Sequence, residues 1–490
     1  MNARLPTQAL NAPQVLQEVS SAWDSSIVAE LSDYIAIPAK SPLFDADWAA
    51  NGHIDTVVRN TASWIEAQKV PGLSLEVVRL HGQTPVLFFE VASTRSPGPD
   101  ARAQTVLLYG HLDKQPEFSG WRSDLGPWTP KYLDGKLYGR GGADDGYAAY
   151  AAIAAIQALK SQQVEHPRII GVIETCEESG SPNLPQYIDL LSPRLGDVGL
   201  VVCLDSGAGN YEQLWLTNSL RGVAGGVLKV QILSEGVHSG DASGLVPSSF
   251  RILRQVLDRL EDSATGRLLP AAFHCAVPPE RLAQARATAA ILGDAVYKNF
   301  PWAHYDCGGD QRFALPTTTD PLQGLLNRTW APALSVVGVD GFPEMKDAGN
   351  VLRPFTAFKL SLRLPPLIDA GSAVQELKTL LEDNAPYQAR VTFEPLGQAT
   401  GWNAPDTAPW FERALDDASQ TYFGAPCGYI GQGGTIPLMN MLSQGFPKAQ
   451  MMVCGVLGPK SNAHGPNEFL HVPYAKKLTA AVAQVIAHCP

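Results

Sequence analysis

The sequence lacks long apolar runs, and positive charge is in the minority. No stretch of its 490 residues is long and apolar enough to span a bilayer. The formal net charge is −11, which argues against a surface that binds nucleic acid or an anionic membrane. The N-terminal segment lacks the continuous apolar core of a signal peptide, so we expect a cytoplasmic protein.

Cysteine is also sparse, and several common catalytic motifs are missing. The seven cysteines are odd in number, and no two have the spacing of a zinc knuckle or a redox pair. We therefore interpret them as reduced, mostly buried thiols. The chain has no Gly-x-Ser-x-Gly elbow, no histidine followed by Glu and no Gly-x-x-x-x-Gly-Lys loop. These absences disfavour a serine hydrolase, a single-zinc protease of the His-Glu-x-x-His type and a phosphate-loop enzyme.

What is present indicates an α/β protein. The length exceeds what one hydrophobic core normally serves, so we expect two domains. Runs rich in Val, Ile, Leu or Met with little alternation suit strands buried on both faces of a parallel sheet. Four such runs occupy residues 105–109, 168–174, 200–204 and 450–455. Helical patterns lie at 14–35, 54–69 and 145–160, which favours a βαβ architecture.

The middle of the chain has a different pattern. Strands are expected at 226–233, 333–339, 357–364 and 388–394, with helices at 248–261 and 373–384. This β-α-β-β-α-β order resembles a ferredoxin-like α+β sheet with both helices on one face, with an insertion at 263–328 that is partly helical at 280–296. We therefore predict a mostly parallel-sheet catalytic domain in residues 1–217 and 397–490, interrupted by a second domain in residues 218–396.

Histidines and carboxylates follow the apolar runs. The side chains in question are His111, Asp113, Glu177, Glu178, Asp205 and His464, and Asp144 opens the Ala-rich helix after residue 144. Ligands bind beyond the carboxyl ends of the strands of a parallel sheet, so these groups should meet at one edge. That convergence carries more weight than any single motif.

The residue types point to metal chemistry. Histidine and carboxylate donors without thiolate suit Zn²⁺, Mn²⁺ or Co²⁺ in a catalytic site. Two histidines and three carboxylates are too many for one ion that keeps a position for water, and about right for two ions that share a carboxylate. The surplus positive charge of two divalent ions would favour a bridging hydroxide near neutral pH.

Each motif also has a simpler interpretation. His111 and His464 could be loop or turn histidines, and Asp205 could end a strand in a turn. Asp144 with its neighbour could cap a helix, and the Glu177–Glu178 pair could be solvated loop charges. Five such coincidences at the ends of buried elements are improbable.

Together these residues resemble a known family. His111 and Asp113, the Gly-Arg-Gly of residues 139–141 with Asp144 and its neighbour, Glu177-Glu178 followed by Gly-Ser, Asp205 and His464 are similar to the two-zinc metallopeptidases of the carnosinase, carboxypeptidase G, aminoacylase and succinyl-diaminopimelate desuccinylase family. The resemblance extends from about residue 24 to the C-terminus. Residues 110–116, the following Gly-Trp at 120–121, the large insertion and the turn at 433–437 resemble the dipeptidase, carnosinase-like branch most.

The resemblance implies a role for each residue. Asp144 would bridge two metal ions, zinc above all, with His111 and Asp205 on one ion and Glu178 and His464 on the other. Asp113 would fix the tautomer of His111. Glu177 would act as general base towards the bridging water.

The resemblance also implies that the middle segment is a lid and dimerisation domain. His238 would reach into the partner subunit's site and stabilise the oxyanion. Arg363 would bind the terminal carboxylate of the substrate, and Asn350 and Thr435 would line its pocket. From the residues alone, His238 could equally cap a turn and Arg363 could be an ordinary strand residue.

The sequence departs from the family pattern near the expected site. Gly146-Tyr147 replaces the common Lys-Gly, Thr435 stands where Ser is frequent, and Lys114 stands where an apolar residue is usual. None of these changes removes an expected ligand or the base, so they put substrate choice in doubt and leave the chemistry intact.

We weigh three functions. The first is a homodimeric peptidase with two divalent metal ions that cleaves dipeptides or short peptides. The second is an N-acyl-amino-acid amidohydrolase that uses the same residues. The third is a catalytically silent metal-binding protein, which the presence of Glu177 disfavours.

Overall fold

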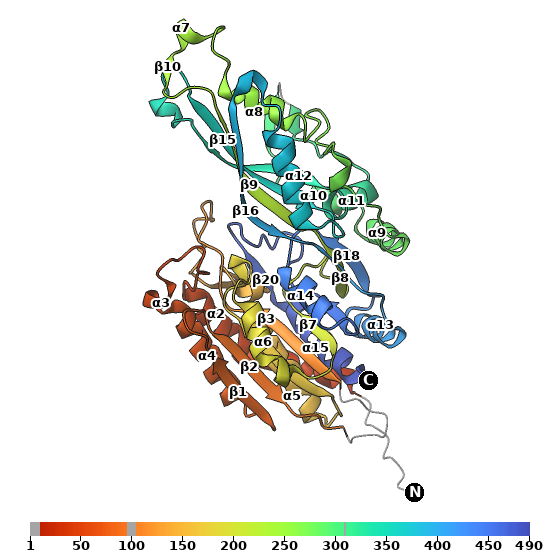
Figure 1. Cartoon of the computed structure of the whole chain (residues 1–490). Coiled ribbons are helices and arrows are strands. Elements are labelled where there is room, and N and C mark those ends of the chain that lie inside the picture. Colours follow the sequence, from red (N-terminus) through yellow and green to blue (C-terminus); the bar gives the residue numbers. More distant parts are fainter. Residues whose placement is uncertain (1–9, 96–103, 308–309) are drawn as a thin grey trace. The chain divides into compact units, whose positions relative to one another are not determined.

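A computed structural model describes residues 10–95, 104–307 and 310–490. The chain divides into two compact units, and Figure 1 labels their elements. Unit 1 comprises Met1–Thr217, Ala404–Ile430 and Met441–Pro490, and unit 2 comprises Asn218–Asn403 and Gly431–Asn440. Unit 2 thus runs past residue 396 and takes in a later segment. The hydroxyl of Thr435 in that segment bonds to Arg221 and Arg363 of the same unit.

Unit 1 is built on a six-stranded sheet. Its order is β1 (Leu73–Val78), β2 (Val86–Val91), β6 (Arg168–Glu174), β3 (Thr105–His111), β7 (Val198–Cys203) and β19 (Gln450–Val453). The last four are parallel and coincide with the four predicted apolar runs. β1 and β2 add an antiparallel edge. The predicted mostly parallel α/β sheet is confirmed.

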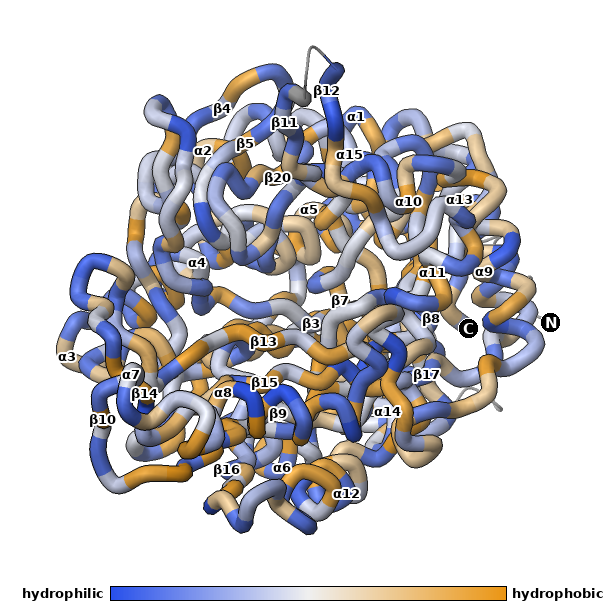
Figure 2. Tube along the Cα trace, turned by 90° about the horizontal axis from the view of Figure 1, so that it is seen from above, coloured by the Kyte–Doolittle hydropathy of each residue, from blue (hydrophilic) through white to orange (hydrophobic). Residues whose placement is uncertain are grey.

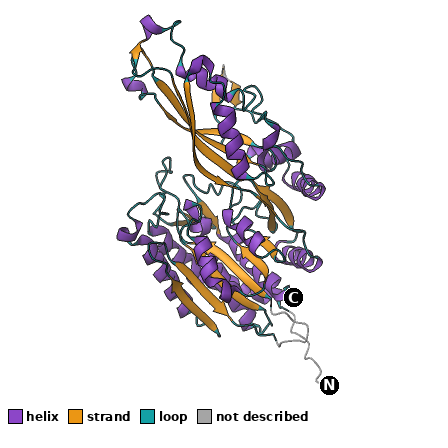
Figure 3. Cartoon of the chain, in the orientation of Figure 1, coloured by secondary structure: helices purple, strands orange, loops and turns teal. Residues whose placement is uncertain are grey.

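Helices pack against both faces of this sheet (Figure 3). The main ones are α1 (Ala12–Ala22), α2 (Val28–Ala36), α4 (His53–Ala67), α5 (Tyr147–Ser161), α6 (Leu184–Leu195), α13 (Pro409–Phe423) and α15 (Val472–His488). In α5, 12 of 15 residues are buried, and most are alanine. The small alanine side chains let α5 approach β3 closely. Gly110 of β3 leaves room for this contact, because a Cβ at that position would lie only 2.6 Å from the Cβ of Ala148. The close packing brings the start of α5 next to the end of β3.

Shorter elements complete unit 1. A small sheet has the order β20 (Phe469–His471), β5 (Lys136–Tyr138) and β4 (Lys131–Leu133), and α3 (Trp48–Asn51) precedes α4. The chain passes between the units within β8 (Trp215–Leu220), after β17 (Trp402–Asn403), within β18 (Gly428–Gln432) and within α14 (Pro437–Gly445). No helix in the described ranges is both long and apolar enough to cross a membrane.

Unit 2 contains the predicted α+β sheet. Its order is β13 (Ala333–Asp340), β15 (Phe355–Leu364), β9 (Gly222–Gln231) and β16 (Arg390–Ala399), and all neighbours are antiparallel. Along β9, buried and half-buried residues alternate, as in a sheet with one covered face. Helices α8 (Ser249–Leu257) and α12 (Ala370–Glu382) contribute to one core with the strands, formed around Leu228, Leu253, Leu360, Leu377 and Phe393. Both predicted helices therefore lie on the same face.

Edge strand β13 has an exposed apolar character. It is mostly hydrophobic in Figure 2, and Val336, Val337 and Val339 are 47%, 59% and 63% exposed. The insertion before it contains α9 (Pro279–Leu292), α10 (Ala295–Lys298), α11 (Pro321–Thr329) and the hairpin β11 (His304–Cys307)–β12 (Asp310–Phe313). A two-stranded antiparallel sheet pairs β10 (Val237–His238) with β14 (Val351–Leu352), next to α7 (Ser239–Ala242).

Candidate metal centre

Two histidines and three carboxylates of unit 1 meet at the carboxyl edge of the parallel sheet. His111 is the last residue of β3, Glu178 lies in the turn after β6, and Asp205 follows β7. Asp144 lies in the short non-helical turn that precedes α5, and His464 lies in the loop between β19 and β20. The structure brings together all five residues that the sequence singled out.

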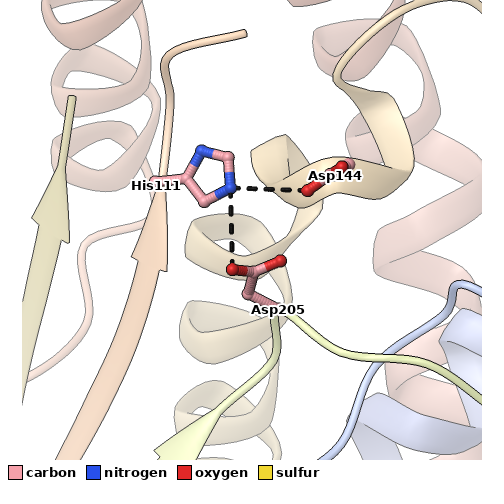
Figure 4. Close-up of side chains that lie close together, drawn as sticks. All are labelled: His111, Asp144 and Asp205. Carbon is pink, nitrogen blue, oxygen red and sulfur yellow. Dashed lines mark ion pairs between the residues drawn. The ribbon is translucent and has the colours of Figure 1, made fainter. Parts of the chain in front are cut away.

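The first group consists of His111, Asp144 and Asp205 (Figure 4). The Nε2 atom of His111 lies 3.5 Å from Oδ1 of Asp144 and 3.8 Å from Oδ2 of Asp205. All three side chains are buried, and Nε2 of His111 has no hydrogen-bond partner among the described residues. An unpartnered, buried nitrogen that points at two carboxylates is suited to bind a cation.

The second group consists of Asp144, Glu178 and His464. The Nε2 atom of His464 lies 3.0 Å from Oδ2 of Asp144 and 3.4 Å from Oε2 of Glu178. Asp144 therefore presents one carboxylate oxygen to each histidine. It is the only residue that the two groups share.

The spacing of the ligand atoms fits divalent ions. Ligands about 2.0–2.2 Å from a tetrahedral ion lie about 3.3–3.6 Å from one another. Two of the four separations, 3.5 and 3.4 Å, lie in this range, and the other two, 3.8 and 3.0 Å, lie close to it. Within each group the candidate ligand atoms all lie within 4.8 Å of one another. Each group can thus hold one ion without rearranging the strands that carry it.

The loop that carries Asp144 is tightly constrained. The peptide bond between Asp144 and Asp145 is cis, and Gly141 has φ +83°. A Cβ on Gly141 would meet the Lys114 side chain at 2.7 Å, so glycine is required there for both conformation and space. The fully buried guanidinium of Arg140 pairs with the fully buried carboxylate of Glu468, whose Oε1 accepts a hydrogen bond from Gly141 N at 2.9 Å.

Asp113 organises the turn that carries both glutamates. Its Oδ1 accepts from Glu177 N at 3.1 Å and its Oδ2 from Glu178 N at 2.9 Å. The Nδ1 atom of His111 lies 3.1 Å from the main-chain oxygen of Asp113 and 3.5 Å from its Oδ1. Either acceptor would keep the proton on Nδ1 and leave Nε2 free to bind a metal.

Carboxylates crowd this edge of the sheet, and their pKa values are shifted. Burial raises the pKa of Glu178 and Asp205, and the negative charge of Asp144 or Glu177 raises it further. Burial also raises the pKa of Glu177 to about 7. The pKa of Asp144 is lowered despite its burial, because the imidazoles of His111 and His464 lie beside its two carboxylate oxygens. A pair of divalent cations would relieve the repulsion between these groups.

The remaining candidate residues lie in unit 2 and form two pairs. His238 and Asn350 are side by side, because Ser239 N donates to Asn350 O at 2.9 Å. The His238 side chain is 68% exposed, and its Nδ1 accepts from Gly240 N, so it does cap a turn. In the second pair, Arg363 donates to the Thr435 hydroxyl at 3.1 Å.

Sequence reasoning missed several residues that support the centre. Glu468 belongs to no recognised motif, and 328 positions separate it from its partner Arg140. Gln115 donates to Oε2 of Glu178 at 2.6 Å. The unusual Lys114 is fully buried, and its Nζ donates to the main-chain oxygens of Tyr34 and Ile37 at the end of α2. In the sequence, only the position of Lys114 between apolar segments could have suggested that it is buried and bonds to the main chain.

Comparisons with known proteins agree with this geometry. The chain is 28% identical over 445 residues to a cysteinylglycine-S-conjugate dipeptidase of Corynebacterium striatum. This match covers 86% of this chain and 90% of the relative. It is 26% identical over 382 residues to a human beta-Ala-His dipeptidase, covering 75% and 70% of the two chains. Among solved structures, the dipeptidase Dug1p of Saccharomyces cerevisiae superposes with a TM-score of 0.77 at 21% identity, covering 98% and 99%. Human carnosine dipeptidase 1 superposes with a TM-score of 0.75 at 22% identity, covering 99% of both chains.

A match to a family model shows which family this fold and its metal chemistry belong to. Residues 107–488 match peptidase family M20/M25/M40, which is most of the chain and includes all five candidate ligands. The chain therefore belongs to peptidase family M20/M25/M40 and is a metallopeptidase that hydrolyses peptide bonds.

Proposed function

We propose that this protein is a dipeptidase that holds two divalent metal ions, zinc by preference, in the two groups that share Asp144. The observation that carries the proposal is the position of the Asp144 carboxylate, with one oxygen towards His111 and the other towards His464. We assign His111 and Asp205 to one ion and Glu178 and His464 to the other. The names of the relatives, which are dipeptidases, support a dipeptide as substrate.

Glu177 is the proposed general base. It is held next to Glu178 by the Asp113 carboxylate and belongs to neither group of candidate ligands, which leaves its carboxylate available to take up and release a proton. When bound, the metal ions would polarise the scissile carbonyl and lower the pKa of water between them. Glu177 would accept the proton of that water and pass it to the leaving amine. Asp113 would keep the proton of His111 on Nδ1.

Unit 2 supplies the proposed substrate contacts. Arg363 would bind the terminal carboxylate of the dipeptide through its planar guanidinium, and Thr435 would orient that guanidinium while lining the pocket. His238 and Asn350, next to each other at the two-stranded β10–β14 sheet, would contact the scissile carbonyl region. A hydrogen bond from His238 Nε2 would stabilise the developing oxyanion.

We further propose that the protein is a homodimer in which His238 serves the partner's site. The exposed apolar edge strand β13 and the exposed His238 side chain both support a surface that another subunit covers. In a mixture of His238→Ala and Glu177→Ala chains, one site of each mixed dimer would keep both groups. Activity regained on refolding the two inactive variants together supports the shared site, and continued inactivity refutes it.

We propose the cytoplasm as its location. Six cysteines of the described ranges are free thiols, and most are buried. Free thiols are the usual state in a reducing compartment.

The test of the proposed function combines metal analysis with two substrate panels. Purified protein should contain about two transition-metal ions per chain by elemental analysis, as a two-ion site requires. A chelator should abolish cleavage of dipeptides, and added Zn²⁺ or Mn²⁺ should restore it. Cleavage confined to N-acyl amino acids would instead make the protein an amidohydrolase. Failure to bind metal supplied in excess would refute the ligand assignment.

A further inference from the structure

Three arginines of unit 2 lie close together without a carboxylate. Arg221 follows β8, Arg328 lies in the last turn of α11, and Arg363 is in β15. Burial, followed by the positive charges of Arg363 and Arg328, lowers the pKa of Arg221 to about 10. Burial likewise lowers the pKa of Arg328 and of Arg363. Within residues 10–95, 104–307 and 310–490, no acidic side chain forms an ion pair with any of the three.

Neutral groups hold two of these arginines in place. The Thr435 hydroxyl donates to the main-chain oxygen of Arg221 at 2.6 Å and accepts from Arg363 at 3.1 Å. The side chain of Arg221 donates to the main-chain oxygens of Gly433 at 3.2 Å and Ala331 at 3.4 Å. These contacts fix positions but contribute no negative charge.

Arg328 is less constrained. Its guanidinium lies 5.9 Å from the centre of the Phe300 ring, a weak cation–π contact. The described part of the chain offers its guanidinium no hydrogen bond and no ion pair. An arginine that is largely removed from water and has donors to spare is suited to receive an anion.

Placing three positive side chains close together raises the free energy of the folded chain, and a bound anion would lower it. Arginine stays protonated in proteins, so the three side chains cannot relieve their repulsion by losing a proton. Where this chain buries an arginine in unit 1, at Arg140, it supplies the carboxylate of Glu468. The cluster in unit 2 has three half-buried charges and no such partner, so a bound anion would offset the repulsion between them.

We propose that Arg221, Arg328 and Arg363 form a site for two carboxylates, so that Arg328 and Arg221 select peptides whose C-terminal residue is Asp or Glu. The inference rests on the proposed function, in which Arg363 binds the main-chain carboxylate of the substrate. The side-chain carboxylate of the same residue would then face Arg328 and Arg221. Two carboxylates would offset two of the three positive charges.

The experiment compares two peptides that differ only in charge, Ala-Glu and Ala-Gln, on the metal-loaded enzyme. We expect kcat/KM to be at least about tenfold higher for Ala-Glu, since a hydrogen bond to a charged group contributes that much discrimination or more. Arg328→Gln should bring the ratio close to one. The control Arg286→Gln makes the same charge change at an exposed position of α9 and should leave the ratio unchanged.

A binding measurement separates this inference from the proposed function. Calorimetry should detect glutarate binding to the full chain, weakened at least about tenfold in Arg328→Gln and unchanged in Arg286→Gln. Equal hydrolysis of the two peptides by the wild-type enzyme would overturn the inference and leave the proposed function standing. If neither peptide is cleaved, the proposed function fails, and glutarate affinity then decides the anion site alone: sensitivity to Arg328→Gln supports it, and insensitivity overturns it.

Discussion

Glu177 and Glu178 are neighbours in one turn, yet their surroundings differ. Glu178 points at His464 and receives a hydrogen bond from Gln115. Glu177 belongs to neither group of candidate ligands, although its main chain is held by the same Asp113 carboxylate. In the proposed mechanism, the Asp113 carboxylate therefore holds side by side one residue that would bind a metal and one that would move a proton.

This division predicts opposite behaviour for two matched variants. Glu177→Gln should lower kcat by about 100- to 10,000-fold, the usual contribution of a general base, while metal content stays at the wild-type level. Glu178→Gln should reduce metal content as well as activity, because the amide is a poorer ligand. Elemental analysis and steady-state kinetics on both variants test the assignment. Equal metal loss in both would contradict it.

A substitution of Asp113 tests the role of a single residue that contacts a candidate ligand. Asp113→Asn can accept only one of the two main-chain hydrogen bonds and removes the charge next to His111. We expect metal affinity to fall about 10- to 100-fold, as is usual when an outer partner of a ligand is changed. Competition against a chromophoric chelator measures the change, with the exposed Asp134→Asn as control. An unaltered affinity would mean that Asp113 only shapes the turn.

The candidate ligands could be predicted from sequence because each follows or precedes a buried element with a clear pattern. His111 ends one buried strand, Glu178 and Asp205 follow two others in short turns, and the apolar runs of all three strands are plain in the sequence. Glu468 could not be predicted in this way. Its role depends on a partner 328 positions away and on a loop conformation that no local pattern specifies.

At the scale of elements, the buried strands and amphipathic helices were predictable and the edges were not. The four parallel strands have continuous apolar runs, because both of their faces are covered. β1 alternates between exposed and half-buried residues, and only its antiparallel pairing with β2 defines it. The helical pattern expected at 14–35 ends within one residue of the end of α2, but the hydrogen bonds from Lys114 to its last carbonyls were beyond prediction.

The Arg140–Glu468 pair connects the Asp144 loop to the segment before β20, and its loss should weaken unit 1. Glu468→Gln leaves the Arg140 guanidinium buried without a counter-charge. We expect the melting temperature to fall by about 10 °C, the effect of breaking a buried ion pair in a domain of this size. Differential scanning calorimetry measures the shift, with the exposed Glu412→Gln on α13 as control. A shift no larger than the control's would show that the pair contributes nothing to stability.

At the scale of the whole molecule, an exposed apolar edge strand should have a partner. Val339 in β13 is 63% exposed, so Val339→Lys leaves the core of unit 2 untouched. If β13 forms the proposed dimer interface, this variant should sediment as a monomer and lose activity with the shared His238 contact. Analytical ultracentrifugation tests this, with Leu43→Lys at a 70% exposed position of unit 1 as control. A Val339→Lys protein that remains a dimer would place the interface elsewhere.

The way in which unit 2 interrupts unit 1 has a consequence for the order of events on the ribosome. Four of the five candidate ligands are translated within residues 111–205, but His464 and strand β19 follow only after the whole of unit 2. A nascent chain that has reached residue 403 can complete most of its inserted unit while β7, already paired with β3, still lacks its second neighbour β19. It can assemble the group of His111, Asp144 and Asp205 but not that of Asp144, Glu178 and His464. Under the proposed ligand assignment, the group that would hold the second ion is thus completed only near the end of synthesis.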